Sequence, residues 1–236
     1  MSGSAVVIGA SGGIGRALTQ RLVAEGGFEA VWAVSRSAAA VPGAQALAAD
    51  LEDEDSLAQA AARIAQGAAP TLVLVATGVL HDGFQPERSL RQLEAEHLLR
   101  DYRINTVGPA LVAKHLLPLL PRDRRAVFAA LSARVGSIGD NRLGGWHAYR
   151  ASKAALNMIL RNLAIETART HPLAVVAGLH PGTVDTGLSA PFQKGVGEGR
   201  LFSPDHSAER LLAVAAGLTP GDSGGVFAWD GARIPE

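Results

Sequence analysis

The stretch Ala5-Val6-Val7-Ile8-Gly9-Ala10-Ser11-Gly12-Gly13-Ile14-Gly15 joins a short apolar run to the start of a helical pattern. Glycines permit a tight turn and let the backbone approach a ligand closely. A helix that begins after such a turn offers free N–H groups and the positive end of its dipole to a phosphate. The stretch therefore predicts a strand, a turn and a helix that bind the pyrophosphate of a dinucleotide. The alternative is that the glycines serve only the turn.

Short apolar runs alternate with longer helical patterns along the rest of the chain, which favours an α/β fold with a parallel sheet. We expect one Rossmann-type doubly wound domain over residues 1–236, with a mostly parallel seven-stranded sheet flanked by helices. The expected strands are residues 5–9, 30–35, 44–49, 71–76, 126–132, 174–180 and 226–229. The expected helices cover about residues 14–25, 54–67, 89–120, 148–169 and 205–217.

Composition excludes several classes of function. The 236 residues carry a formal net charge of zero, so there is no electrostatic reason to expect nucleic acid or an anionic membrane as partner. The absence of cysteine excludes disulfides, thiolate metal sites and cysteine nucleophiles. The seven histidines do not show metal-ligand spacing, and we expect no metal site. No apolar run approaches the roughly 18 residues of a membrane span or forms a signal-peptide core, which predicts a cytoplasmic protein.

The end of the second expected strand, Val34-Ser35-Arg36, contains no carboxylate that could bind a ribose 2′-hydroxyl. Arg36, helped by Ser11, Ser35 or Ser37, could instead pair with a 2′-phosphate. This predicts NADP(H) in preference to NAD(H), and the alternative is that Arg36 is an ordinary solvated arginine. The other cofactor contacts expected at strand ends are Asp50 and Leu51 at the adenine, and Ala76, Thr77 and Gly78 at a ribose.

Tyr149 and Lys153 lie four residues apart in an expected helix, so their side chains share one face. A lysine cation lowers the pKa of a nearby phenol, which is near 10 in a free tyrosine. Lowering it by about three units takes about 4 kcal/mol, which requires a partly desolvated site. Taken alone, the spacing also fits a surface lysine that lies over a tyrosine.

Together these residues resemble the classical short-chain dehydrogenase/reductase family across essentially the whole chain. In that family a Gly-x-x-x-Gly-x-Gly turn, an Asn, a Ser and a Tyr-x-x-x-Lys pair occur in this order. Residues 141–155 and 180–187 look closest to the subgroup that contains the C-factor signalling proteins and sniffer-like carbonyl reductases. The resemblance implies an NADP(H)-dependent oxidoreductase that transfers a hydride between nicotinamide and a small-molecule carbonyl or alcohol.

The resemblance also implies a role for each site residue. Tyr149 would be the general acid–base, Lys153 would hold the ribose hydroxyls and lower the pKa of Tyr149, and Asn105 would fix a water in a proton path. The remaining cofactor contacts lie in the glycine-rich turn and after the sixth strand: Gly9, Ser11, Gly13, Ile14, Gly15, Pro181, Gly182, Thr183, Val184 and Thr186.

The expected catalytic serine departs from the family pattern. The family usually ends its fifth strand Ser-Ser-x-x-Gly, and the second Ser donates to the substrate oxygen. Counting back from Gly136 places Ala133 at that position. Ser132 is our expected catalytic serine, and Ser137 is the alternative. Because loss of one donor can cost about a hundredfold in rate, a dinucleotide-binding signalling or regulatory protein with weak catalysis is a second hypothesis. A purely structural protein is a third hypothesis, under which the glycine-rich turn and the pair of Tyr149 and Lys153 would be coincidental.

Two further expectations concern surfaces. Residues 189–203 form a segment with closely spaced glycines, which is either a mobile substrate lid or a surface loop. In the family, the helices that carry residues 105–120 and 149–167 often form a four-helix interface, which implies a homodimer or homotetramer. Their apolar composition fits core packing equally well.

Overall fold

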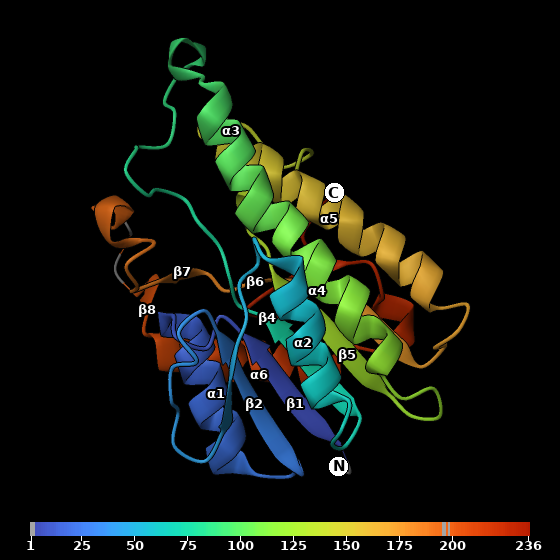
Figure 1. Ribbon diagram of the computed structural model, residues 1–236. Helices are drawn as coiled ribbons and strands as arrows, with labels where there is room; N and C mark the ends of the chain where they lie inside the picture. Colours follow the sequence, from blue (N-terminus) through green and yellow to red (C-terminus); the bar gives the residue numbers. More distant parts are fainter. Residues whose placement is uncertain (1–2, 195–196, 198) are drawn as a thin grey trace.

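Seven parallel strands form the central sheet of the computed structural model (Figure 1), which describes residues 3–194, 197 and 199–236. Their order is β3-β2-β1-β4-β5-β6-β9, and each neighbouring pair is parallel. The strands are β1 (Ser4–Ile8), β2 (Ala30–Ser35), β3 (Gln45–Ala48), β4 (Pro70–Val75), β5 (Ala126–Leu131), β6 (Ala174–His180) and β9 (Val226–Ala228). The expected Rossmann-type α/β fold is confirmed.

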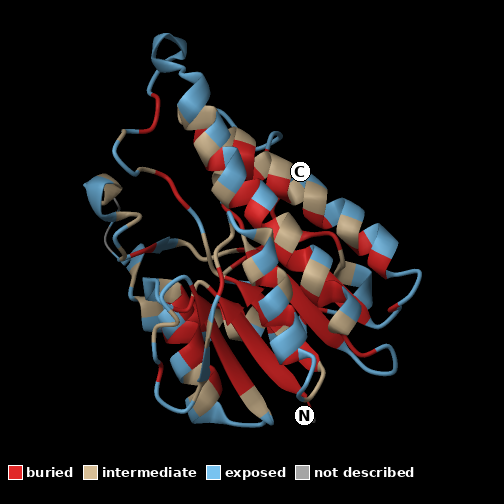
Figure 2. Cartoon of the chain, viewed as in Figure 1, coloured by how far each residue is buried: buried red, intermediate tan, exposed pale blue. Residues whose placement is uncertain are grey.

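Helices cover both faces of the sheet, which explains the nearly continuous apolar strands. Along β1, Val6 and Ile8 pack with α2, α4 and α5, whereas Ala5 and Val7 pack with α1 and α6. Buried residues therefore concentrate in the strands and on the inner helix faces (Figure 2). The helices are α1 (Gly13–Glu25), α2 (Glu54–Ile64), α3 (Ala95–Tyr102), α4 (Gly108–Leu116), α5 (His147–Thr167) and α6 (Pro204–Gly217).

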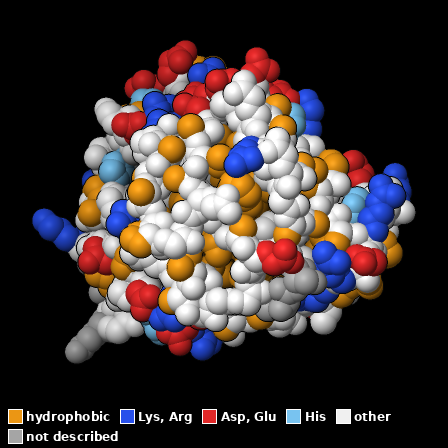
Figure 3. Space-filling view, turned by 60° about the horizontal axis from the view of Figure 1, so that its bottom comes forward, with side chains coloured by type: hydrophobic (Ala, Val, Ile, Leu, Met, Phe, Trp, Pro, Cys, Tyr) orange, Lys and Arg blue, Asp and Glu red, His pale blue; other side chains and the backbone are white. Residues whose placement is uncertain are grey.

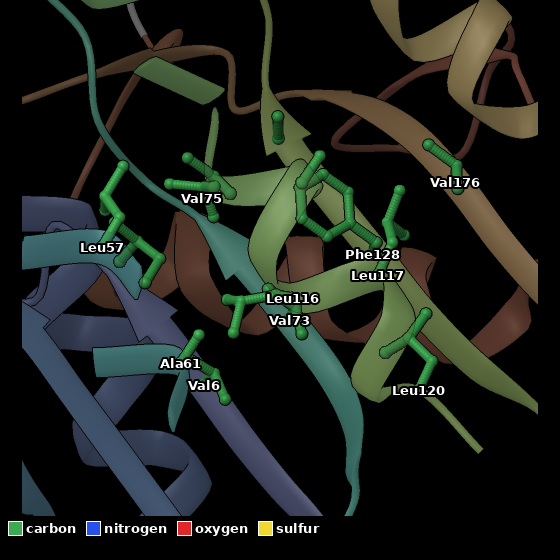
Figure 4. Packing of buried hydrophobic residues seen from close by; sticks show 14 of the residues in the cluster. Val6, Leu57, Ala61, Val73, Val75, Leu116, Leu117, Leu120, Phe128 and Val176 are labelled. Carbon is green, nitrogen blue, oxygen red and sulfur yellow. The ribbon is translucent and has the colours of Figure 1, made fainter. Parts of the chain in front are cut away.

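The larger core layer lies under α2, α4 and α5. Phe128 on β5 is fully buried there and packs among Val73, Leu116 and Val176 from neighbouring elements (Figure 4). Strand side chains alternate between the two faces, so one apolar strand supplies both layers. This packing fixes the helices of the site against the sheet.

The prediction of one long helix over residues 89–120 is wrong in two respects. The first α-helix begins later, at Ala95, and the helical stretch is interrupted. Residues before Ala95 form only a short 3₁₀ turn, η1 (Leu90–Gln92), because Glu94 is extended. A π-helical segment, η2 (Arg103–Val107), separates α3 from α4, and a 3₁₀ turn, η3 (Leu117–Leu119), follows α4. Such π segments insert an extra residue into a helix and occur mostly at functional sites.

Two short strands, β7 (Thr183–Val184) and β8 (Leu201–Phe202), pair in parallel outside the main sheet and are absent from the sequence prediction. β7 precedes the segment expected to act as a lid, and that segment contains the 3₁₀ turn η5 (Ala190–Phe192) and β8. Residues 195, 196 and 198 of that segment lie outside the described residues. The lid therefore stays a prediction.

Surface features bear on the expected partners. Acidic and basic side chains are interspersed over the face shown in Figure 3, in keeping with the zero net charge. In the part of the chain that the structure describes, no helix combines the length and apolarity needed to cross a membrane. Val107, Met158 and Ile165 are exposed apolar residues on the segments expected to form an oligomer interface. The homo-oligomer itself stays a prediction.

Candidate active site

A cleft of about 370 Å³ opens at the carboxyl edge of the sheet, where β1 lies between β2 and β4. In doubly wound sheets, ligands bind at this edge, at the point where the strand order reverses. The predicted cofactor residues that line the cleft are Gly9, Ser11, Arg36, Asp50, Leu51, Ala76, Thr77 and Gly78. Four segments far apart in the sequence thus meet at one place.

In the glycine-rich turn, the backbone lies so close to neighbouring backbone that two positions leave no room for a side chain. Gly9 has a φ of 88°, and a Cβ atom on it would lie 2.9 Å from the carbonyl oxygen of Ala76. A Cβ on Gly15 would lie 2.2 Å from the carbonyl oxygen of Gly9. Gly12 is the N-cap of α1 and has no side chain to cap the first N–H groups. These groups therefore remain available to a phosphate, so the turn suits a dinucleotide.

Other groups in the cleft fit the rest of a dinucleotide. Among the described residues, the Thr77 hydroxyl oxygen is shielded from solvent and has no hydrogen-bond partner, as expected of a group awaiting a ligand. Arg36 is exposed at the rim. Ser35 also lines the cleft, and its hydroxyl accepts from the backbone N of Ala39 at 3.0 Å. Its expected help to Arg36 stays a prediction. Ile14 follows in the first turn of α1.

Tyr149 and Lys153 stand in the first two turns of α5, and both are buried. The Lys153 Nζ lies 5.8 Å from the centroid of the Tyr149 ring and donates to the carbonyl oxygen of Leu131 at 2.8 Å. A Cβ on Gly78 would lie 3.5 Å from that Nζ. Gly78 lines the cleft, and so do Leu80 and Leu188, which belong to the same apolar cluster as Tyr149. The predicted catalytic pair therefore lies behind the wall of the cleft.

Burial dominates the protonation of this pair. It raises the pKa of Tyr149, and the charge of Asp101 raises it further. Burial lowers the pKa of Lys153 to about 8, and Asp101 opposes that shift. The expected lowering of the phenol's pKa by Lys153 is therefore wrong for this structure, since the loss of water around the phenol raises that pKa.

Asn105 lies in the π segment and is completely buried. Its Oδ1 accepts from the backbone N of Val79 at 2.8 Å, and its Nδ2 donates to the Val79 carbonyl oxygen at 2.9 Å. The second Nδ2 hydrogen is directed to the Ser152 hydroxyl at 3.1 Å. The amide thus joins the chain after β4 to α5, next to Lys153. Its expected water-holding role stays a prediction.

Neither expected serine presents its hydroxyl to Tyr149. Ser132 donates to Oδ1 of Asn157 at 2.6 Å, and Asn157 lies two turns, about 12 Å, beyond Tyr149 along α5. Ser137 accepts from the backbone N of Asp140 at 3.1 Å. Ala133 lies in the same buried apolar cluster as Tyr149, together with Leu80. Strand alternation explains this, because successive side chains point to opposite sides.

An aromatic wall lies beside Tyr149, and sequence reasoning did not predict that Phe192 joins Trp146 in it. The Trp146 ring centroid is 6.3 Å from that of Tyr149 and 5.1 Å from that of Phe192. His81 lies 5.7 Å from Phe192, and its Nε2 is 3.0 Å from the carbonyl oxygen of Gly187. The further cleft residues that sequence reasoning missed include Glu52, Val79, Leu80, His81, Asp82, Arg100, Ile104, Gly187 and Leu188. No sequence signal marks them, because loop conformation brings them together.

The segment expected to seat the nicotinamide follows β6. Pro181, Gly182, Thr183 and Val184 lead into Thr186, whose Cγ2 would lie 2.7 Å from a Cβ on Gly13. The nearby cleft wall is made by the next residues, Gly187 and Leu188. Within the described residues, no group of three His, Asp or Glu side chains has the geometry of a metal site.

Comparisons with known proteins agree with this geometry. A family model described as short chain dehydrogenase matches residues 4–196. The C-signal of Myxococcus xanthus is 34% identical over 147 residues, which are 62% of this chain and 83% of that protein. The NADPH-bound carbonyl reductase from chicken fatty liver has a TM-score of 0.84 and 25% identity, over 99% of this chain and 98% of the other.

The carbonyl reductase Sniffer of D. melanogaster has a TM-score of 0.81 and 23% identity over the full length of both chains, which shows a shared fold. The expected resemblance to the subgroup of C-factor proteins and sniffer-like reductases is confirmed.

The contact between Gly13 and Thr186 predicts how the turn tolerates substitution. Gly13→Ala should lower the free energy of unfolding by about 1–3 kcal/mol, since its Cβ would lie 2.7 Å from the Thr186 Cγ2. Thr186→Ser removes that methyl group, so the double variant should recover most of the loss. Urea unfolding of the four proteins measures this coupling. Strictly additive effects would contradict the close approach.

Proposed function

This chain belongs to the short-chain dehydrogenase family, and on that premise we propose that it is an NADP(H)-dependent oxidoreductase acting on a carbonyl or alcohol. The observation that carries the proposal is the buried pair Tyr149 and Lys153, which lies behind the cleft wall formed by Gly78, Leu80 and Leu188. The similarity to an NADPH-bound carbonyl reductase supports it. The reaction we propose is reduction of a carbonyl.

When bound, NADP(H) supplies or accepts the hydride. Tyr149 remains protonated because burial raises its pKa, so it is suited to donate its phenolic proton to a carbonyl oxygen. Lys153, with Nζ at Gly78, is placed to hold ribose hydroxyls and to stabilise the phenolate that remains. The wall of Trp146 and Phe192 excludes water from the reacting groups.

We propose that Arg36 pairs with the 2′-phosphate of NADP(H). Its guanidinium is exposed at the cleft rim directly after β2, where a planar fork can bind a phosphate through two hydrogen bonds. Asp50 holds the adjoining loop, since its Oδ1 accepts from the backbone N of Glu52 at 3.1 Å. Its other oxygen is then left for the adenine amino group.

A dinucleotide-binding regulatory protein with weak catalysis is the second candidate. One observation favours it: Ala133, which has no hydroxyl, shares an apolar cluster with Tyr149, while Ser132 donates to Asn157 and Ser137 accepts from the backbone N of Asp140. The similarity to the C-signal of Myxococcus xanthus points the same way. Measured turnover of a carbonyl substrate distinguishes the oxidoreductase from the regulatory protein.

Tyr149→Phe should reduce turnover by about 10²-fold or more, because it removes the proton donor. Tyr102→Phe is a matched control, since the chain has two tyrosines and Tyr102 is partly exposed on α3. NADPH oxidation is followed against a panel of aldehydes, ketones, diketones and quinones, with NADPH binding measured in parallel. Full activity in Tyr149→Phe would refute its role, and NADPH binding without wild-type turnover would favour the regulatory candidate.

Arg36→Ala should weaken NADPH binding about ten- to hundredfold, the equivalent of a charge-assisted contact worth ~1.5–3 kcal/mol. NADH binding should change little, because NADH has no 2′-phosphate. Arg63→Ala, at the far end of α2, controls for the loss of one positive charge. Calorimetric titration with both cofactors measures the preference. An equal loss for NADH and NADPH would exclude a phosphate contact.

Ala133→Ser should raise the turnover of the reductase about tenfold or more, because it restores a second donor to the carbonyl oxygen. Ala133→Cys adds an atom of similar size that is only a weak donor, so it should give little gain. Steady-state kcat with NADPH and a reducible substrate compares the three proteins. A serine variant no faster than the cysteine variant would mean that the position does not face the reacting oxygen.

A further inference from the structure

The helix that carries the proposed catalytic pair begins without a side-chain cap of its own. Trp146 is the N-cap of α5, and an indole cannot accept a hydrogen bond from the first turn. The backbone of Trp146 is left-handed, with a φ of 49°, which is uncommon for a residue other than glycine. Such a backbone persists only where its surroundings hold it. Because Tyr149 is the third residue of this helix, the group that holds the start of α5 also places the phenol.

Glu87 supplies the missing cap from another segment, between β4 and α3. Its side-chain Oε2 accepts from the backbone N of Ala148 at 3.2 Å, a bond between residues 61 positions apart. An N-cap side chain normally makes this bond to the second or third residue of its own helix. The backbone oxygen of Glu87 also accepts from the N of Trp146. One residue outside the helix thus holds both the N-cap and the second helical residue of α5.

The chain that enters α5 lies close against Glu87. A Cβ on Gly145, whose φ is 64°, would lie 3.3 Å from the backbone oxygen of Glu87. The next residue is Trp146, whose ring centroid lies 6.3 Å from that of Tyr149 and 5.1 Å from that of Phe192. The contacts of Glu87 therefore act on the proton donor and on the aromatic wall beside it.

The buried carboxyl of Glu87 is not explained by stability. The residue is 2% exposed, and within the described residues its Oε1 is shielded from solvent and has no hydrogen-bond partner. A buried carboxyl oxygen without a donor destabilises a fold. Apolar side chains of similar volume would avoid this cost. Groups that break such rules are expected where they serve a function.

We propose that Glu87 is a positioning residue for Tyr149, because its carboxyl caps α5 from outside the helix and thereby fixes the place of the phenol. The effect on turnover rests on the proposed function, whereas the placement of the ring does not. Loss of the cap frees the backbone N of Ala148 and loosens the first turn of α5. Lys153 lies one turn further along the hydrogen-bonded helix, so cofactor binding changes little.

Three substitutions separate the reach of the acceptor from its charge. Glu87→Gln keeps an acceptor oxygen at the same reach and removes the charge, so kcat should stay within about threefold of the wild type. Glu87→Asp keeps the charge but withdraws the carboxyl by one methylene, so kcat should fall about fivefold. Glu87→Ala removes the acceptor and should lower kcat about tenfold or more, with the Kd for NADPH within about twofold of the wild type.

Asp53→Ala is the matched control. The Asp53 carboxyl is the N-cap of α2, where it accepts from two backbone N–H groups. Its removal should lower the Tm by about 2–4 °C. Because α2 carries no proposed proton donor, kcat at saturating NADPH should stay within about twofold of the wild type. The control thus shows what loss of a carboxyl cap does to turnover through stability alone.

Fluorine NMR reads the position of the phenol without substrate. The chain contains two tyrosines, Tyr102 and Tyr149, so protein labelled with 3-fluorotyrosine gives one resonance for each, and Tyr149→Phe assigns them. In Glu87→Ala and Glu87→Asp the Tyr149 resonance should shift or broaden. In Glu87→Gln it should stay close to its wild-type position. The Tyr102 resonance should be unchanged in all three, which controls for a general loss of structure.

Each result bears on the positioning role. An unchanged Tyr149 resonance in Glu87→Ala would overturn it. Wild-type kcat in Glu87→Asp with a large loss in Glu87→Gln would also contradict it, because the charge and not the cap would then matter. A loss of kcat in Asp53→Ala as large as in Glu87→Ala would reduce the effect to stability. Absence of any wild-type turnover, with the Tyr149 resonance shifted in Glu87→Ala, would count against the proposed function and leave the cap supported.

Discussion

The side-chain amide of Asn105 is the contact on which the geometry of the site depends. It pairs with both the N–H and the carbonyl of Val79 and reaches Ser152 with its remaining hydrogen. The loop after β4 is thereby bonded to the helix that carries Tyr149 and Lys153. Each of these bonds is buried, and leaving one unmade would cost about 1–3 kcal/mol. The π segment is the local distortion that brings this side chain to the cleft.

Burial on both faces made the sheet predictable from sequence. A strand such as β5 must be apolar at every position because helices cover each side, and the glycine turn after β1 has its own signature. The two-residue strands β7 and β8 gave no such signal, since they exist only through pairing between distant segments. The π segment was hidden for a related reason: its residues fit a regular helix pattern, and tertiary contacts of Asn105 favour the extra residue.

The site was predicted less completely than the fold because its chemistry depends on burial and direction. Ser132 was the expected catalytic serine, yet its hydroxyl donates to Asn157, because successive side chains of a strand point to opposite sides. Spacing alone predicted that Lys153 would lower the pKa of Tyr149, yet desolvation of the phenol has the larger effect. The sequence carries no measure of how much water surrounds a side chain. The pairing of Trp146 with Phe192 was not predicted for the same reason as the short strands, because it joins two segments that are far apart in the sequence.

The missing hydroxyl at position 133 and the uncapped start of α5 both concern Tyr149. In the reaction that we propose, a methyl group at position 133 would leave the carbonyl oxygen of a substrate with one side-chain donor fewer, and Tyr149 would be its main donor. A single donor must then be held closely, since small displacements of a reacting group are costly in rate. Tyr149 follows a left-handed residue at a helix start without a cap of its own, and Glu87 holds that start from a neighbouring segment. The positional accuracy of the proton donor therefore depends on a carboxyl group outside its own helix.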